Sequence, residues 1–202
     1  LLALGSRGDV QPFVPLGAAL RERGHRVRVA SFATYERLFR GAGFDFHAIG
    51  GDAQALVLAA GNGLLTGGRN PLTGTLALRR SFATLADGIG HDLADPVLRD
   101  TDLILNQLPG NLYGADLAEH LGIKSLSVGV LPLSRTRAWP MMAFPPGPVG
   151  PTRYNDLSYG IATGLLWLLF GPAIQRWRTR TLGLRRLDAA QALAERATSP
   201  MI

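Results

Sequence analysis

Residues 1–13, LLALGSRGDVQPF, join a short apolar run, a glycine-rich turn and the start of a helix. Leu1 to Leu4 predict a buried strand, because a short apolar run bounded by turn residues is typical of one. Gly5 to Gly8 predict a turn, and the apolar residues of 12–23 recur at helical spacing. Gly24 then ends the helix, since glycine readily takes the left-handed conformation of a C-cap. A strand, a turn and a helix in this order form the repeating unit of a parallel α/β sheet.

The rest of the chain repeats this alternation. Strands are predicted at residues 27–30, 44–49, 102–105 and 124–130, and helices at residues 35–40, 76–98 and 112–121. Residues 50–75, rich in Gly, Asn and Thr, predict a loop interrupted by a short helix at residues 53–60. Six prolines between Leu131 and Pro151 predict an extended surface loop, because proline disfavours regular structure. We therefore expect one Rossmann-like α/β domain over residues 1–202, with a parallel sheet flanked by helices.

The composition limits the chemistry that the chain can perform. It has 202 residues, 47% of them hydrophobic, so it can bury a sizeable core. It has no cysteine, which excludes a disulfide framework, a thiolate metal site and a thiol nucleophile, and which fits a reducing cytoplasm. The sequence starts inside a strand pattern, without the regions of a signal peptide, and stops soon after a helical stretch. We expect a fragment, trimmed at both ends.

The net charge of +6 raises the question of nucleic-acid binding, because Arg and Lys neutralise phosphates. All but one of the 21 basic residues are Arg, and they are scattered, so no nucleic acid is predicted as a partner. The exception is a cluster near the end of the chain, formed by Arg176, Arg178, Arg180, Arg185 and Arg186. The cluster is either a solvated face or a site for anionic lipid or an acidic partner.

Residues 157–174 contain no charged side chain and are just long enough to span a bilayer. Glycine, serine, threonine and proline interrupt the stretch, so a packed helix is favoured over a transmembrane one. Peripheral membrane contact is a third interpretation. It rests on Trp167, Phe170 and Trp177, which lie beside the arginine cluster, because aromatic and cationic side chains together suit the headgroup region.

The polar residues of the first turn lie where ligands bind in open α/β sheets, at the carboxyl end of a strand. The turn lacks both the G-x-G-x-x-G spacing of a dinucleotide site and the G-x-x-x-x-G-K-[ST] spacing of a P-loop. An oxidoreductase domain for a nucleotide cofactor is therefore disfavoured, although a glycine turn before a helix can still receive a phosphate. The four histidines show neither H-x-x-x-H nor H-E-x-x-H spacing, so no metal site is expected.

Several motifs accompany this turn. GSRGDVQPF (5–13) and RGHRVRVA (23–30) are followed by GFDFHAIGGD (43–52), SRTRAWP (134–140) and a Tyr-Asn pair at 154–155. Together these motifs resemble the N-terminal domain of GT-B fold glycosyltransferases, in particular the sterol 3-beta-glucosyltransferases and family 28-like enzymes, which are related to natural-product glycosyltransferases. The resemblance implies the acceptor-binding half of an enzyme that transfers a hexose from a nucleotide-sugar, with UDP-glucose favoured. The implied acceptor is a hydroxyl of a sterol, lipid or natural product.

The resemblance also implies an inverting mechanism, in which a base in the first loop takes the proton of the acceptor hydroxyl. Asp9 occupies that position, in the frame Gly8-Asp9-Val10-Gln11-Pro12 where related plant-type enzymes have His. A free carboxylate is a weak base at neutral pH, so the role requires a dry pocket or a late proton transfer. The alternative is that Asp9 only caps the first helix.

The donor side of the site is expected to include other residues of the same region. Ser6, Arg7 and Gly8 are expected near the donor phosphates or in the cleft, and Arg7 is favoured because a guanidinium pairs well with phosphate. Asp52 follows two glycines and either caps a helix or faces the cleft between the two domains.

The acceptor pocket is expected in the proline-rich loop, where similar enzymes shape it. The residues expected to bind the acceptor are Arg135, Thr136, Arg137 and Trp139. An aromatic ring such as that of Trp139 can form a flat apolar wall against the ring system of an acceptor. The alternative interpretation is that Trp139 is packed in the core. Residues 53–75 are expected to decide which apolar acceptor is bound.

In this architecture a second, C-terminal domain binds most of the nucleotide-sugar donor, and that domain is the expected partner of this chain. The 202 residues contain no His-Gly-Gly donor signature, so the chain alone is expected to be inactive. Neither a cofactor nor a metal is expected besides the donor. The expected localisation is cytoplasmic, with peripheral membrane contact left open. The alternative function is a non-catalytic Rossmann-like module that binds a small apolar ligand.

Overall fold

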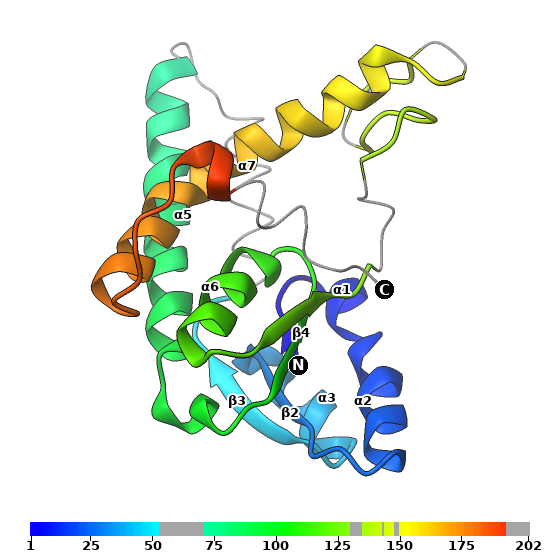
Figure 1. Cartoon of the computed structure of the whole chain (residues 1–202), viewed down its shortest axis with the longest axis vertical. Coiled ribbons are helices and arrows are strands. Elements are labelled where there is room, and N and C mark those ends of the chain that lie inside the picture. Colours follow the sequence, from blue (N-terminus) through cyan, green and yellow to red (C-terminus); the bar gives the residue numbers. More distant parts are fainter. Residues whose placement is uncertain (53–70, 130–134, 143, 148–149, 193–202) are drawn as a thin grey trace.

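The computed structural model describes residues 1–52, 71–129, 135–142, 144–147 and 150–192. Within these residues the core is a sheet of five strands in the order β3-β2-β1-β4-β5 (Figure 1). The strands are β1 (Leu2–Ala3), β2 (Arg28–Phe32), β3 (Asp45–Ile49), β4 (Leu103–Asn106) and β5 (Lys124–Ser127). Every pairing between neighbouring strands is parallel, so the predicted Rossmann-like sheet is confirmed.

Helices connect the strands and cover the sheet. They are α1 (Arg7–Val10), α2 (Phe13–Glu22), α3 (Glu36–Gly41), α5 (Pro71–Leu93), α6 (Asn111–Leu121) and α7 (Arg153–Arg180). Short 3₁₀ helices are η1 (Ala33–Tyr35) and η2 (Pro96–Arg99).

The two faces of the sheet have separate cores, because successive residues of a strand point to opposite sides. On one face, Ala3 and Val29 pack with Phe13 of α2. On the other face, Leu4 and Phe32 belong to a larger cluster with residues of α5, α6 and α7. The domain is therefore a parallel sheet between two layers of helices, as the sequence predicts.

Helix α5 differs from the predicted helix 76–98 at both ends, since it begins at Pro71 and ends at Leu93. Proline suits the first turn of a helix, where the missing N–H has no partner to lose. The early end has a related cause: Pro96 disfavours a helical conformation of the residue before it, and the chain continues in η2. The short helix predicted at 53–60 lies outside the described residues.

The first turn and the fifth strand also differ from the prediction. The sequence predicts a turn over residues 5–8, whereas the structure has a one-turn helix, α1, that begins at Arg7. Strand β5 ends at Ser127 rather than at residue 130, because Ser127 pairs with Asn106, the last residue of β4. The described parts of the proline-rich segment contain neither helix nor strand, as predicted.

Helix α7 is capped by Thr152, whose side chain accepts a hydrogen bond from the backbone N–H of Asn155. Its C-terminal half packs on α5, with Phe170, Ile174 and Trp177 buried, and this half is the packed helix that the sequence favours (Figure 1). Its N-terminal half stands clear of the sheet (Figure 1). Among the described helices, only α7 is long and apolar enough to span a bilayer by length and composition, and 33% of its most apolar stretch is buried within the chain.

Candidate active site

The first loop folds back on itself at the carboxyl end of β1. Oδ2 of Asp9 accepts two hydrogen bonds from Ser6, one from the backbone N–H at 2.8 Å and one from the hydroxyl at 2.8 Å. The backbone N–H of Asp9 donates to the carbonyl oxygen of Ser6 at 3.0 Å. The two residues form a capping box at the start of α1. The capping interpretation of Asp9 is therefore correct for this one oxygen.

The other carboxylate oxygen of Asp9 has different surroundings. Oδ1 accepts no hydrogen bond from the residues that the structure describes, and the side chain is half-buried. Two donors on one oxygen fix the carboxylate, so that the remaining oxygen keeps its capacity to accept a proton or a hydrogen bond. An oriented carboxylate at a ligand-binding edge can accept a proton from a bound hydroxyl.

Side chains from three neighbouring strands meet at this edge of the sheet. Tyr35 lies at the end of η1, which follows β2; Asp52 follows β3, and Arg7 and Asp9 follow β1. Burial raises the pKa of the Tyr35 hydroxyl above its ordinary value. The negative charges of Asp52 and Asp9 raise that pKa further, and the positive charge of Arg7 lowers it. The structure thus brings three of the predicted site residues within electrostatic reach of one tyrosine.

Ser6, Arg7 and Gly8 are exposed at the rim of the same edge. Nε of Arg7 donates to the side-chain oxygen of Gln11 at 3.3 Å, and the guanidinium forms no ion pair with any other described residue. An exposed guanidinium without a carboxylate partner remains available to an anionic ligand.

Two further polar residues at this edge are missed by the sequence analysis. Gln107 follows β4, is buried, and donates from Nε2 to the carbonyl oxygen of Leu4 at 3.2 Å. This bond joins the ends of β1 and β4, the pair of strands between which the strand order reverses and where open α/β sheets bind ligands. Asn106 is 1% exposed and bonds to the hydroxyls of Ser125 and Ser127 at 2.6 and 3.2 Å.

Tyr35 is a third such residue, because its sequence context predicts only the start of a helix. Asn106, Gln107 and Tyr35 share one feature of the sequence. Each is a polar residue at the carboxyl end of a strand or a few residues after it. In a parallel sheet all of these ends lie at one edge.

The proline-rich loop is fastened to the first turn of α7. Arg135 and Asp156 form a bidentate pair, with 2.6 Å from Nε to Oδ1 and 2.8 Å from Nη2 to Oδ2. This hydrogen bonding lowers the pKa of the Asp156 carboxyl. The carbonyl oxygen of Arg137 accepts from Nδ2 of Asn155 at 2.8 Å and from the backbone N–H of Thr152 at 2.9 Å. The loop therefore has a defined shape even though it lacks regular structure.

The remaining predicted acceptor residues lie in this loop. Oγ1 of Thr136 accepts from the backbone N–H of Ala138 at 3.1 Å, which stabilises a local turn. Trp139 is 52% exposed, so the alternative that placed it in the core is wrong. The backbone N–H of Met141 donates to the hydroxyl of Ser158 at 2.8 Å and holds the end of this segment on α7.

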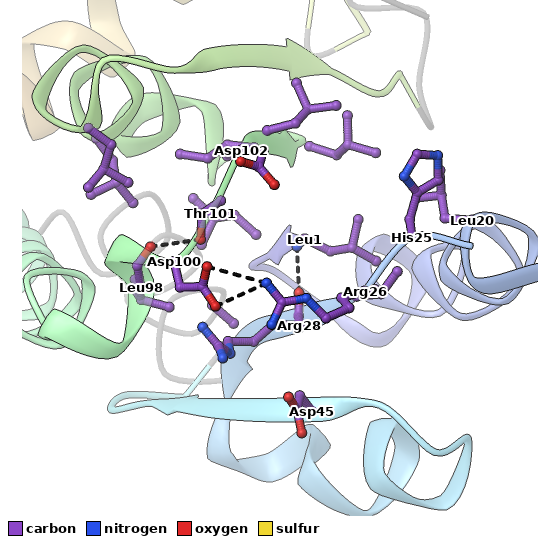
Figure 2. Close-up of a pocket in the computed structure, with 18 of the residues that line it drawn as sticks. Leu1, Leu20, His25, Arg26, Arg28, Asp45, Leu98, Asp100, Thr101 and Asp102 are labelled. Atoms are coloured by element: carbon purple, nitrogen blue, oxygen red, sulfur yellow. Dashed lines mark hydrogen bonds and ion pairs between the residues drawn. The ribbon is translucent and has the colours of Figure 1, made fainter. Parts of the chain in front are cut away.

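A groove of about 440 Å³ lies at the opposite, amino edge of the sheet (Figure 2). It is lined by the starts of β1, β2 and β4 and by the turn that carries His25. The exposed pair Arg26 and Asp100, with 3.1 Å between Nη2 and Oδ2, lies beside it (Figure 2). Because ligands of open α/β sheets bind at the carboxyl edge, this groove is not the site that the sequence predicts.

Two of the four histidines contact the backbone of another segment. His47 and His120 each lie 3.0 Å from a backbone carbonyl oxygen, those of Asp92 and Leu182 respectively. Within the described part of the chain, no three histidine, aspartate or glutamate side chains are grouped so that they could hold a metal ion.

Comparison with known proteins identifies a family for the first part of the chain. Residues 1–89, which include β1, the loop with Asp9 and the stretch that ends in Asp52, match the glycosyltransferase family 28 N-terminal domain. The chain carries a glycosyltransferase family 28 N-terminal domain.

The chain as a whole is similar to sterol 3-beta-glucosyltransferases. It is 32% identical over 191 residues to a sterol 3-beta-glucosyltransferase of Yarrowia lipolytica, covering 93% of this chain and 12% of the relative. It is 33% identical over 196 residues to that of Emericella nidulans, covering 94% of this chain and 13% of the relative. The chain thus spans about an eighth of the length of these relatives.

The fold of the family 28 domain is that of the N-terminal half of GT-B glycosyltransferases. The crystal structure of SsfS6, a glycosyltransferase of Streptomyces sp. SF2575, superposes with a TM-score of 0.50 and 23% sequence identity. The likeness covers 93% of this chain and 46% of SsfS6. At this level of identity the comparison establishes the fold.

Proposed function

We propose that this domain forms the acceptor side of an inverting glycosyltransferase in which Asp9 is the catalytic base. The observation that carries the proposal is the carboxylate of Asp9, held at the carboxyl end of β1 by two hydrogen bonds to Oδ2, with Oδ1 free of partners among the described residues. The transferred group is a hexose, with UDP-glucose as the favoured donor. The acceptor is a sterol or a similar apolar alcohol, which the names of the Yarrowia and Emericella relatives support.

The proposed reaction is a single displacement at the anomeric carbon. The acceptor oxygen attacks this carbon from the side opposite the nucleoside diphosphate while its proton passes to Oδ1 of Asp9. The new C–O bond forms as the bond to the diphosphate breaks, so the configuration inverts and the electron pair leaves with the diphosphate. Because a carboxylate is a weak base, the proton moves late, when the attacking oxygen has become acidic through bond formation.

Donor binding is divided between two domains in this proposal. Arg7, with Ser6 and Gly8 beside it, approaches the donor phosphates from this domain, since its guanidinium is exposed and unpaired among the described residues. A second, C-terminal domain binds most of the nucleotide-sugar. The domain covers 46% of SsfS6 and about an eighth of the sterol relatives, which leaves room in such proteins for a second domain.

The acceptor lies between the first loop and the proline-rich loop in this proposal. Trp139 supplies an exposed aromatic wall, and Arg135, Thr136 and Arg137 shape the segment that carries it. Asp52 faces the cleft. The Tyr35 hydroxyl, whose pKa is raised, stays protonated and can donate a hydrogen bond to a ligand oxygen. We place the enzyme in the cytoplasm, in keeping with its lack of cysteine.

The experiment compares Asp9→Asn with Asp9→Ala in an enzyme that contains this domain and its donor domain. Asn keeps an oxygen that can accept from Ser6 but cannot act as the base, whereas Ala removes both functions. We expect both variants to lower kcat by about 10²- to 10⁴-fold for glucose transfer from UDP-glucose to a sterol. We expect only Asp9→Ala to lose about 1 kcal/mol of stability.

The matched control is Asp100→Asn, because Asp100 is an exposed carboxylate at the amino edge of the sheet. It should leave kcat unchanged. Transfer by Asp9→Asn at the wild-type rate, with loss only in Asp9→Ala, would show that the carboxylate serves as a cap and nothing more.

A further inference from the structure

The N-terminal half of α7 presents a row of large apolar side chains to solvent. Leu157 is 59% exposed, Ile161 43%, Leu165 54% and Leu168 54%. Their spacing of four, four and three residues places them on one face of the helix. We call these four residues the outer stripe. Monomeric soluble proteins rarely expose a contiguous apolar surface of this kind unless it binds something.

The outer stripe is not the aromatic face that the sequence points to. Phe170 and Trp177 are 5% and 4% exposed and belong to the core, and Arg178 is 1% exposed. Two of the three aromatic residues on which the sequence-based case for membrane contact rests, and one of its five arginines, are therefore inside the protein. The exposed apolar face lies earlier on the same helix, where the helix stands clear of the sheet (Figure 1).

The proline-rich loop adds to this surface. Trp139 is 52% exposed and Met142 is 67% exposed. The hydrogen bond from the backbone N–H of Met141 to the hydroxyl of Ser158 places Met142 beside the helical turn that carries Leu157. A flexible thioether side chain therefore lies next to the start of the outer stripe, and the exposed Trp139 stands three residues earlier in the same loop.

The charges around the outer stripe have one sign. Residues 135–180 contain six arginines and one acidic residue, Asp156, and residues 157–175 contain no charged side chain at all. Asp156 is already paired with Arg135. Arg137 and Arg153, at the start of the stripe, are exposed and form no ion pair with a described residue. An apolar surface with unpaired cations at its end complements an anionic lipid bilayer.

We propose that the outer stripe, with Trp139 and Met142, docks the domain on the surface of an anionic bilayer. The stripe enters the boundary between headgroups and acyl chains, and Arg137 and Arg153 contact the headgroup phosphates. The helix lies in the interface and does not cross the bilayer, because its C-terminal half is packed against α5. This proposal rests on the proposed function in one respect only, the sterol-like acceptor. Such an acceptor dissolves in the bilayer, so docking would bring it beside the loop that receives it.

Vesicle flotation with the purified chain tests the docking. The probes are vesicles of phosphatidylcholine alone and of phosphatidylcholine mixed with phosphatidylglycerol in a ratio of roughly three to one. We expect binding to the anionic vesicles, weakened by salt, and a shift of tryptophan emission to shorter wavelength as Trp139 leaves water. Lipids brominated near the headgroup boundary should quench that emission.

Leu165→Ser and Leu103→Ser form a matched pair, because both replace a leucine that is about half exposed, 54% and 42% respectively. Leu103 lies on β4, at the amino edge of the sheet. We expect Leu165→Ser to lower the vesicle partition coefficient about tenfold and Leu103→Ser to change it by less than about twofold. Circular dichroism should show the same melting curve for Leu165→Ser as for the wild type, since the side chain is not in the core.

Arg153→Gln and Arg37→Gln form the corresponding pair for charge, since both arginines are exposed and Arg37 lies on α3. We expect Arg153→Gln to lower binding to anionic vesicles about fivefold and Arg37→Gln to change it little. Binding that is insensitive to both Leu165→Ser and Arg153→Gln overturns the proposal. A second result would also overturn it: Leu165→Ser leaves vesicle binding unchanged but weakens self-association of the chain. The same holds if Leu165→Ser leaves vesicle binding unchanged but weakens the docking of a second domain in a longer enzyme.

The outcome is separable from that of the proposed function, because the vesicles contain neither sterol nor nucleotide-sugar. Asp9→Asn should bind vesicles like the wild type. If Asp9→Asn abolishes transfer and Leu165→Ser has no effect on vesicle binding, only the membrane surface is wrong. The reverse pattern removes Asp9 as the base and keeps the membrane surface.

Discussion

A methyl group on Gly5 would lie 2.7 Å from Oδ2 of Asp9 and 2.9 Å from its Cβ. Gly5 also has a φ of +126°, a conformation that side chains of L-residues rarely adopt. The turn after β1 and the position of the Asp9 carboxylate are therefore one geometric unit. The loop can hold this carboxylate against Ser6 only because the residue at position 5 has no side chain.

Gly5→Ala should displace Asp9 as well as strain the backbone. Gly24→Ala is the matched control, because Gly24 has a φ of +87° and nothing within 4 Å of the position of an added Cβ. We expect both variants to lose about 1–2 kcal/mol of unfolding free energy from the unfavourable backbone conformation. Only Gly5→Ala should also lower transfer, by at least about tenfold, because only it moves the carboxylate. Equal transfer rates in the two variants would contradict the coupling of Gly5 to Asp9.

Arg178 joins α7 to α6 through a buried ion cluster. It is 1% exposed, and its Nη1 lies 2.7 Å from Oδ1 of Asp116, also 1% exposed, while Nη2 lies 2.8 Å from Oε2 of Glu119. Removing the guanidinium leaves Asp116 buried without its ion-pair partner. We expect Arg178→Ala to lower the unfolding free energy by about 3–5 kcal/mol in urea denaturation.

Arg176 provides the control for this prediction, because it lies two residues away on α7 and pairs with Asp87 in solvent, where the two side chains are 42% and 51% exposed. Arg176→Ala should cost less than about 1 kcal/mol, since exposed ion pairs contribute little. Similar losses in the two variants would mean that the buried cluster does not hold α7 in place.

The contact between α5 and α7 depends on Gly90. A Cβ at this position would lie 2.7 Å from Cδ1 of Trp177, whereas a Cβ at Gly88, on the same helix, would meet nothing within 4 Å. We expect Gly88→Ala to raise the unfolding free energy by about 0.5–1 kcal/mol, because alanine is the better helix former. Gly90→Ala should lower it by about 1–3 kcal/mol, because the added methyl group overpacks the interface. Thermal denaturation monitored by tryptophan fluorescence measures both, and stabilisation by Gly90→Ala would refute the close packing.

Tyr113 should make the stability of the domain fall at alkaline pH. Its hydroxyl is buried and donates to the carbonyl oxygen of Ala86 at 3.1 Å. Burial raises its pKa above the ordinary value, and the negative charge of Asp87 adds to this effect. The folded state holds the Tyr113 proton more tightly than the unfolded state does. The stability that this protonated hydroxyl contributes is therefore fully present below about pH 10 and is lost as the pH rises further.

Tyr113→Phe should therefore reduce the fall in unfolding free energy between about pH 9 and pH 11. Tyr154→Phe is the control, because the Tyr154 hydroxyl bonds to the carbonyl oxygen of Pro145 in the proline-rich loop, away from the core cluster. Urea denaturation at a series of pH values measures the slopes. A slope that Tyr113→Phe leaves unchanged would show that another group causes the alkaline loss.

Much of the fold follows from local patterns. The strand at 1–4 is predicted correctly because it is a short apolar run before turn residues, and the helix at 12–23 because its apolar residues recur at helical spacing. In the strand at 44–49 the polar residues Asp45 and His47 alternate with apolar ones. The ends of α5 are less well predicted. They depend on Pro71 and Pro96, whose effects on a helix differ with the position that each occupies.

The sequence predicts the residues of the candidate site only where they lie in a motif that resembles a known family. Asp9, Arg7 and Asp52 lie in stretches that resemble known glycosyltransferases. Tyr35 and Gln107 lie in stretches without such a motif, and they reach the same edge only because five parallel strands end there. A sequence gives no direct sign that residues so far apart along the chain are neighbours.

The sequence by itself determined the alternation of strands and helices, the parallel sheet and the carboxylate after its first strand, because periodicity and turn residues act over short distances along the chain. Only the tertiary structure decided which face of α7 is buried. The apolar residues of that helix show almost no helical periodicity over its whole length, so its sequence does not mark an inner face. The choice came from packing against α5 and from the ion pairs of Arg178, and it left the outer stripe in solvent.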